Sequence, residues 1–144
     1  MHAVQQNLSF RISRQNLNLT IPKILPEVYG DKTRIEQVFF NLVSNALKFN
    51  DKETIEVEVG FHDTEGDFYR FFIRDNGIGI EAEYYDKVFK IFERLNQREE
   101  YEGTGAGLTI VKKIVEQHGG EIWLDSVLAE GTTFYFTLPK FKND

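Results

Sequence analysis

Hydrophobic side chains recur at helical spacing over residues 31–49. The apolar positions are Ile35, Val38, Phe39, Leu42, Ala46 and Leu47. Offsets of three, four and seven residues return to the same side of a helix, so these side chains form one stripe. Asp31 suits the N-cap, because its carboxylate can accept a hydrogen bond from a backbone N–H of the first turn. The pattern therefore predicts an amphipathic helix that buries this stripe.

Beyond Asn50 the hydrophobic spacing changes to two, which is typical of strands with one buried face. Four segments alternate in this way, and we expect them to form strands: 55–61, 68–75, 121–126 and 132–138. A helical period returns from Leu108 and ends at Gly119, and a short helix is expected around 88–92. Strands and helices follow one another without regular βαβ units, which favours an α+β fold. We expect a two-layer α/β sandwich, whose mixed and mostly antiparallel sheet has about three helices on one face.

The composition of the chain limits the kinds of molecule that it can bind and the chemistry that it can carry out. The 144 residues suit one domain. With 17 basic and 23 acidic side chains the net charge is -6, which repels nucleic acid and anionic membranes, so any phosphate site must be local. The absence of cysteine excludes disulfides and a thiol nucleophile. The sequence has no apolar run near the roughly 20 residues of a membrane span and no signal peptide, so we expect a cytoplasmic protein without direct membrane contact.

A second, polar stripe runs along the helix predicted at 31–49. It consists of Arg34, Gln37, Asn41, Asn45 and Lys48. An asparagine oxygen is a suitable ligand for Mg²⁺, and a lysine ammonium can neutralise phosphates. The alternative is an ordinary solvated helix face, which is the commoner role of such residues.

Asp75 ends a predicted strand and is followed by Asn-Gly-Ile-Gly-Ile. A half-buried carboxylate needs hydrogen-bond donors, and the amino group of adenine is one that fits. Gly77 and Gly79 would allow the backbone to bend and to approach a base closely. The alternative is a plain turn capped by the aspartate.

Glycine occupies every second position of the segment 103–107, directly ahead of the helix predicted from Leu108. Such a loop offers unhindered N–H groups and a helix N-terminus to an anion. A flexible linker is the alternative for this segment alone. The three polar features occur in one chain, each beside a predicted strand or helix, which favours a shared phosphate-binding site.

These segments resemble the sequence boxes of sensor histidine kinases. The correspondences are 34–49 with the N box, 75–80 with the G1 box, 88–92 with the F box, 103–108 with the G2 box, and Gly131-Thr132 with the turn that closes the site. The similarity covers roughly residues 27–139, and the stretch after Phe92 resembles the lid of phytochrome-like kinases. The family's catalytic domain is an α/β sandwich shared with gyrase-type, mismatch-repair and heat-shock chaperone ATPases.

The resemblance implies a role for each matching residue. Asn45 would ligate Mg²⁺, and Asn41 and Lys48 would contact the phosphates, so these three would be the catalytic residues. Asp75 would accept the adenine amino proton and Thr132 would support the adenine end. The other nucleotide contacts implied are the base pocket (Gly77, Gly79, Ile80), the lid anchors (Phe89, Phe92) and the ribbon around the triphosphate (Gly103, Thr104, Gly105, Gly107, Leu108).

The resemblance also implies an organisation and an activity. Residues 27–144 would form the ATP-binding catalytic domain, and residues 1–26 a leader with one or two edge strands and the end of an interdomain linker. The domain would bind Mg·ATP and transfer the γ-phosphoryl group to a histidine on a separate helical dimerisation domain. Through that domain it would act indirectly on a response regulator in two-component signalling. We expect the isolated domain to be a monomer.

Asn41 and the histidines bear on the type of reaction. ATP-hydrolysing relatives carry a glutamate at the position of Asn41, and an amide cannot act as the general base for water, so hydrolysis should be slow. His2, His62 and His118 all lack the family's phosphoacceptor context, and we expect His118 to pack at a helix end. An ATPase of the same superfamily and a nucleotide-binding scaffold that transfers nothing remain as alternatives.

Overall fold

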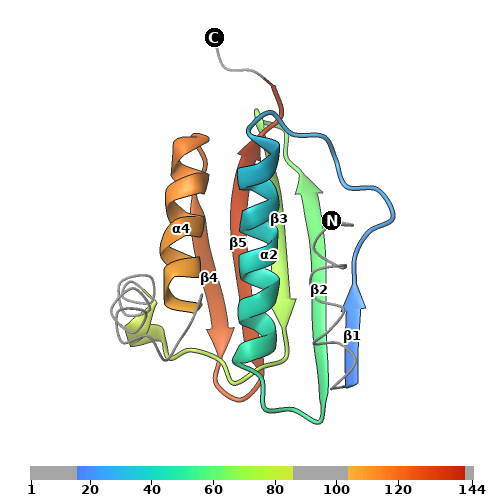
Figure 1. Ribbon diagram of the computed structural model, residues 1–144, viewed down its shortest axis with the longest axis vertical. Coiled ribbons are helices and arrows are strands. Elements are labelled where there is room, and N and C mark those ends of the chain that lie inside the picture. Colours follow the sequence, from blue (N-terminus) through green and yellow to red (C-terminus); the bar gives the residue numbers. More distant parts are fainter. Residues whose placement is uncertain (1–15, 86–103, 142–144) are drawn as a thin grey trace.

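Figure 1 shows the computed structural model, which describes residues 16–85 and 104–141. This part of the chain forms one five-stranded sheet with the strand order β1-β2-β3-β5-β4. The strands are β1 (Asn16–Thr20), β2 (Thr54–Asp63), β3 (Phe68–Asp75), β4 (Ile122–Val127) and β5 (Gly131–Pro139). β1 pairs with β2 in parallel and every other pair is antiparallel. The sheet is therefore mixed and mostly antiparallel, as predicted.

Two α-helices, α2 (Lys32–Lys48) and α4 (Thr104–Gln117), lie side by side on one face of the sheet and run in opposite directions (Figure 1). A short 3-10 helix, η1 (Ala82–Tyr84), follows β3. The α+β two-layer architecture is confirmed. In the described ranges 16–85 and 104–141 the α-helices number two and not three, and the helix expected around 88–92 lies outside those ranges.

An aromatic cluster joins α2 to the sheet. The Phe71 and Phe136 rings stack on neighbouring strands with centroids 5.4 Å apart. The Phe39 ring of α2 meets them edge-on, at 5.4 Å from Phe71 and 5.2 Å from Phe136. Edge-to-face and offset stacking are the preferred arrangements of aromatic pairs. All three side chains are buried, as are the other apolar positions of the predicted α2 stripe.

Polar contacts join the N-terminal end of α2 to the C-terminal end of α4. Asp31 is the N-cap of α2 and accepts a hydrogen bond from the Arg34 backbone at 3.1 Å. The Arg34 guanidinium donates to the Gln117 side chain of α4 at 3.0 Å. His118 Nδ1 donates to the Ile114 carbonyl at 2.8 Å, so Nε2 is the acceptor for the Asp31 backbone N–H at 3.1 Å. His118 is a packing residue at the end of α4, as expected.

None of the helices in 16–85 and 104–141 is long and apolar enough to cross a membrane.

Candidate functional site

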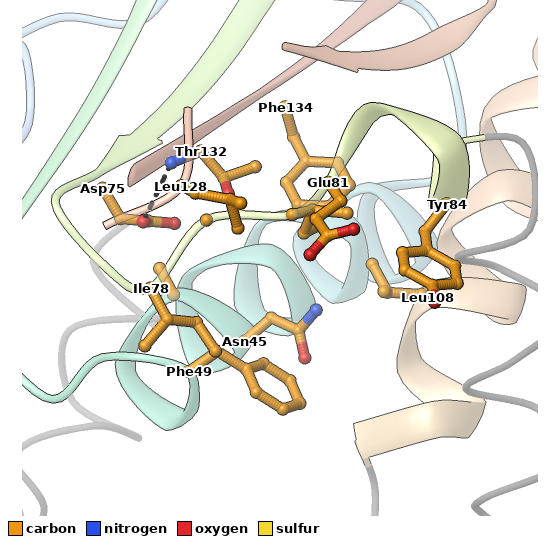
Figure 2. Close-up of a pocket in the computed structure, with 13 residues that line it drawn as sticks. Asn45, Phe49, Asp75, Ile78, Glu81, Tyr84, Leu108, Leu128, Thr132 and Phe134 are labelled. Atoms are coloured by element: carbon orange, nitrogen blue, oxygen red, sulfur yellow. Dashed lines mark hydrogen bonds between the residues drawn. The ribbon is translucent and has the colours of Figure 1, made fainter. Parts of the chain in front are cut away.

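A cavity of about 460 Å³ opens at the opposite end of the helices. It lies between the C-terminal half of α2, the turn after β3, the start of α4 and the β4–β5 connection (Figure 2). Asn45, Asp75 and Thr132 contribute polar atoms to its wall. These three residues come from α2, β3 and β5, so the fold gathers candidates that are far apart in the sequence. Pockets of this volume commonly bind small ligands.

Asp75 lies at the end of β3 with its carboxylate at the cavity wall (Figure 2). Its Oδ1 atom accepts the Gly77 N–H at 2.8 Å and the Thr132 N–H at 3.2 Å. Burial raises the pKa of the Asp75 carboxyl above its ordinary value, while the two N–H donors and the Lys52 charge oppose that rise. Because both bonds use Oδ1, Oδ2 is the oxygen that can accept a proton donor from a ligand.

The turn after β3 requires its glycines for close packing. Gly79 has a φ of 80°, and a Cβ there would lie 2.4 Å from the Val127 carbonyl oxygen. A Cβ at Gly77 would lie 2.5 Å from the Phe49 carbonyl oxygen. Gly79 and Ile80 line the cavity, whereas Gly77 acts through its N–H on Asp75. The glycines thus let the turn pack against α2 and the β4–β5 connection.

Thr132 is buried, with 6% of its surface exposed, and its hydroxyl is held by Ser126. The two oxygens are 2.8 Å apart. Ser126 Oγ donates to the Gly131 carbonyl at 2.8 Å and accepts the Ile80 N–H at 2.8 Å. Since the Ser126 proton is used on Gly131, the Thr132 hydroxyl donates to Ser126 and presents only lone pairs elsewhere. Thr132 can therefore accept from an N–H group or a water, but it cannot donate to one.

Asn45 is the member of the polar α2 stripe that reaches the cavity. Its side chain is 8% exposed and lines the wall (Figure 2). Asn41 is half-buried and Lys48 is exposed on the same helix, and neither lines this cavity as the described residues define it. In the ranges 16–85 and 104–141, no group of three or more His, Cys, Asp or Glu side chains could hold a metal. A cation near Asn45 could take the Asn45 amide oxygen, the Glu81 carboxylate that also lines the cavity, and ligands that arrive with it.

Most of the remaining wall is apolar. Its other side chains include Phe49, Ile78, Leu108, Leu128 and Phe134, together with the Glu81 carboxylate and the Tyr84 ring. A slot with apolar faces and a carboxylate at one end suits a flat heterocycle that carries an amino group. Sequence reasoning identified Leu108 as a contact but missed Phe49, Leu128 and Ser126. The Leu128 position gives no signal, because it lies in the turn between β4 and β5 and reaches the cavity only through the docking of that turn.

The glycine string differs from its prediction. We expected residues 103–107 to form a loop ahead of a helix starting at Leu108, but α4 begins at Thr104. Thr104, Gly105 and Gly107 therefore belong to the first turns of the helix. Each glycine costs a helix only about 1 kcal/mol relative to alanine, and the buried side chains that follow stabilise the helix by tertiary packing. Leu108, one turn into α4, lines the cavity.

Three other candidates, Phe89, Phe92 and Gly103, lie outside the residues that the structure describes. The N-terminal turn of α4 is close to the cavity through Leu108, and free N–H groups at a helix N-terminus attract anions. The cavity thus has the Asp75 carboxylate and Thr132 at one side, and the Asn45 amide and the Glu81 carboxylate nearer to this helix start (Figure 2).

Comparisons with known proteins agree with this geometry. Residues 30–142 match the family described as "Histidine kinase-, DNA gyrase B-, and HSP90-like ATPase". Cyanobacterial phytochrome B of Nostoc sp. is 47% identical over 139 residues, which are 96% of this chain and 18% of the phytochrome. The chain therefore spans less than a fifth of the length of that relative.

Solved structures give the same result. The mycobacterial sensor histidine kinase MprB has 26% identity and a TM-score of 0.77, over 96% of this chain and 90% of that one. Full-length ShkA in complex with AMPPNP has 25% identity and a TM-score of 0.78, over 99% of this chain and 29% of that one. The chain belongs to the histidine kinase-, DNA gyrase B- and HSP90-like ATPase family, and its fold is that of a histidine kinase catalytic domain.

Proposed function

We propose that this chain binds Mg·ATP in the cavity and transfers the γ-phosphoryl group to a histidine of a separate helical dimerisation domain. The observation that carries the proposal is the meeting of Asp75, Thr132 and Asn45 at one cavity of about 460 Å³. The likeness to the sensor histidine kinase MprB supports it, and so does the AMPPNP bound in ShkA, another structural neighbour. In two-component signalling, the phosphorylated partner would pass its phosphoryl group to a response regulator.

The Asp75 end of the cavity is suited to adenine. An ionised Asp75 accepts from the exocyclic amino group, and Thr132, which presents only lone pairs, accepts from a bridging water or the same amino group. The faces of the base would contact apolar side chains such as Ile78 and Leu128. Guanine would place its O6 acceptor against the carboxylate, which disfavours it. The wall therefore favours adenine nucleotides.

The Asn45 end is suited to phosphates and Mg²⁺. Asn45 supplies a neutral oxygen ligand, and Mg²⁺ takes most of its remaining ligands from phosphates and water. When bound, the ion would neutralise charge on the phosphates. Asn41 and Lys48, on the same face of α2, would contact the phosphates, and the N–H groups around Gly105 and Gly107 at the start of α4 would do the same.

Transfer is favoured over hydrolysis by the residues of α2. Asn41 is an amide and cannot take a proton from water at neutral pH. A neutral imidazole needs no such base: its nitrogen lone pair forms the N–P bond while the bond to the ADP oxygen breaks. His118 is not suited to be the acceptor, because both of its ring nitrogens are hydrogen-bonded. The acceptor would therefore be supplied by a partner, to which the chain binds as a monomer.

A phosphotransfer assay tests the proposal. The chain is incubated with Mg·ATP labelled at the γ position, with and without a separately made histidine-bearing helical domain from a similar kinase. We expect acid-labile label on the partner domain and little release of phosphate in its absence. Steady phosphate release without the partner would indicate an ATPase instead. ATP binding with neither transfer nor release, for cognate and related helical domains alike, would indicate a scaffold that only binds nucleotide.

A further inference from the structure

Lys52 connects three segments at the Asp75 end of the cavity. Its Nζ atom donates to the Asn76 carbonyl at 3.0 Å and to the Ala129 carbonyl at 2.7 Å. Asn76 belongs to the turn after β3 and Ala129 to the β4–β5 connection, while Lys52 lies between α2 and β2. One ammonium therefore ties together the two backbone turns that bound the adenine end of the cavity.

The neighbouring contacts hold Lys52 in this position. Asn50 Oδ1 accepts the Lys52 backbone N–H at 2.9 Å, and Asn50 Nδ2 donates to the Asn76 side chain at 2.7 Å. The Ala129 N–H donates to the Ile78 carbonyl at 2.8 Å, and Ala129 has a φ of 65°. A left-handed conformation at a residue other than glycine persists when the surroundings fix it. The ammonium donates to the carbonyl of this strained residue.

Lys52 also acts on Asp75 through its charge. Its ammonium lowers the pKa of the Asp75 carboxyl against the opposing effect of burial. The other groups that act on this carboxyl, the backbone N–H groups of Gly77 and Thr132, are neutral. Glu56 on β2 is charged but hydrogen-bonds the Asn76 side chain, at 3.4 Å. Lys52 is therefore the charged group, among the described residues, whose field stabilises the ionised Asp75.

We infer that Lys52 is a positioning residue for adenine-nucleotide binding: from outside the cavity it holds the two turns together and places its positive charge near the Asp75 carboxylate that accepts the adenine amino group. This inference rests on the proposed function. Lys52 does not line the cavity, so it acts through Asp75 and the turns and not by contact with the base. Two effects are expected from its loss, a weaker nucleotide complex and a change in how binding depends on pH.

The experiment compares binding of Mg·ADP from pH 5 to pH 8 by wild type, Lys52→Met, Lys52→Gln and Lys52→Arg. Lys23→Met is the matched control, because Lys23 is exposed on a connection far from the cavity. We expect Lys52→Met to weaken ADP about 5- to 10-fold at neutral pH, the size expected for losing charge-assisted hydrogen bonds. We also expect binding to be lost at a higher pH on acidification, because without the ammonium Asp75 protonates more readily.

The remaining variants distinguish an electrostatic role of Lys52 from a purely structural one. Lys52→Gln keeps a donor but not the charge, so it should also show the shift to higher pH, while Lys52→Arg and Lys23→Met should bind as wild type does. The titration of the ADP phosphate is common to all variants and cancels in the comparison. Wild-type affinity in Lys52→Met overturns the inference. Weakening at every pH without a shift also overturns it, since that would indicate a purely structural role.

Failure of the inference is distinguishable from failure of the proposed function. Suppose that wild type binds Mg·ADP, that Asp75→Asn weakens this binding, and that the Lys52 variants bind as wild type does. Only the role of Lys52 is then rejected. If wild type binds no adenine nucleotide, both are rejected. Should Lys52→Met not fold, as judged by circular dichroism, the pH profile of Lys52→Gln against Lys52→Arg gives the same test.

Discussion

The backbone N–H of Thr132 donates to the carboxylate of Asp75 at 3.2 Å, although the two residues are 57 positions apart. The contact exists because β3 and β5 are antiparallel neighbours, with Arg74 paired to Thr133. The end of one strand therefore meets the beginning of the other at the cavity. The geometry of the proposed adenine contact is set by strand register and not by a local loop.

Replacing Asp75 should separate stability from binding. The pKa of Asp75 is raised above its ordinary value of 3.8 by burial, so the folded state holds the proton more tightly than the unfolded state. Wild type therefore loses stability as the pH rises from 3.8 through the raised pKa of Asp75 in the folded state, and the loss persists at higher pH. In Asp75→Asn, the amide oxygen can still accept both N–H bonds without the charge. We expect urea unfolding at pH 7 to show a variant at least as stable as wild type.

The difference between Asp75→Asn and wild type should shrink as the pH falls toward 3.8, where the wild-type carboxyl is neutral as well. A variant that is clearly less stable than wild type at pH 7 would contradict this expectation.

Gly79→Ala should destabilise the protein by about 2 kcal/mol or more, because it adds strain at a positive φ and a clash with backbone. The added Cβ would lie 2.4 Å from the Val127 oxygen, which cannot move without displacing β4. Gly66→Ala is the control: its Cβ would meet nothing closer than the Thr64 hydroxyl, at 3.9 Å, and its effect should stay within about 0.5 kcal/mol. Equal midpoints in chemical denaturation would refute the prediction.

Tyr85→Phe should loosen the free edge of β4. The Tyr85 hydroxyl accepts the Ser126 N–H and donates to the Ser126 carbonyl, both at 2.7 Å. Removal of the hydroxyl leaves both backbone groups without this partner, at a cost of about 1–2 kcal/mol. Amide exchange at Ser126 should become faster. Tyr84→Phe, at a side chain that is 43% exposed, should change neither stability nor exchange, and an equal response of the two variants would argue against the assigned bonds.

His118→Ala should lower stability while leaving nucleotide affinity unchanged. The ring accepts the Asp31 N–H and packs on Gly30, where an added Cβ would lie 2.4 Å from the ring. Its loss should cost about 1–3 kcal/mol, and the cavity lies at the other end of the helices. Thermal unfolding and ADP titration of the same sample test both parts. A marked loss of ADP affinity in the folded variant would show that the two ends are coupled.

Local periodicity predicted the elements well. The helix expected over 31–49 is Lys32–Lys48 with Asp31 as its N-cap, and the strand expected over 68–75 is Phe68–Asp75. These elements are long and repeat their apolar spacing several times, so one misplaced residue does not change the assignment. The start of α4 was predicted at Leu108 and lies at Thr104. The reason is that tertiary packing stabilises this helix by more than its glycines destabilise it.

The sequence predicted the residues of the motifs, but it did not predict most of the residues that hold the site in place through hydrogen bonds. Asp75, Thr132 and Asn45 lie at one cavity, and their nucleotide contacts remain a prediction. Ser126, Tyr85 and Lys52 gave no signal, because each acts through a contact 41 or more positions away in the sequence. Such contacts depend on strand register and on how turns dock, which a periodic pattern does not specify.

Calorimetric titration of Mg·ADP and Mg·GDP into wild type and Asp75→Asn is the most direct test of the proposed adenine site. We expect wild type to bind ADP and to bind GDP more weakly, and Asp75→Asn to lose about 1–3 kcal/mol of ADP affinity, the cost of mismatching one buried donor–acceptor pair. Equal ADP affinity in the two proteins, or equal affinity of wild type for ADP and GDP, would contradict the assignment of Asp75 as the residue that recognises the base.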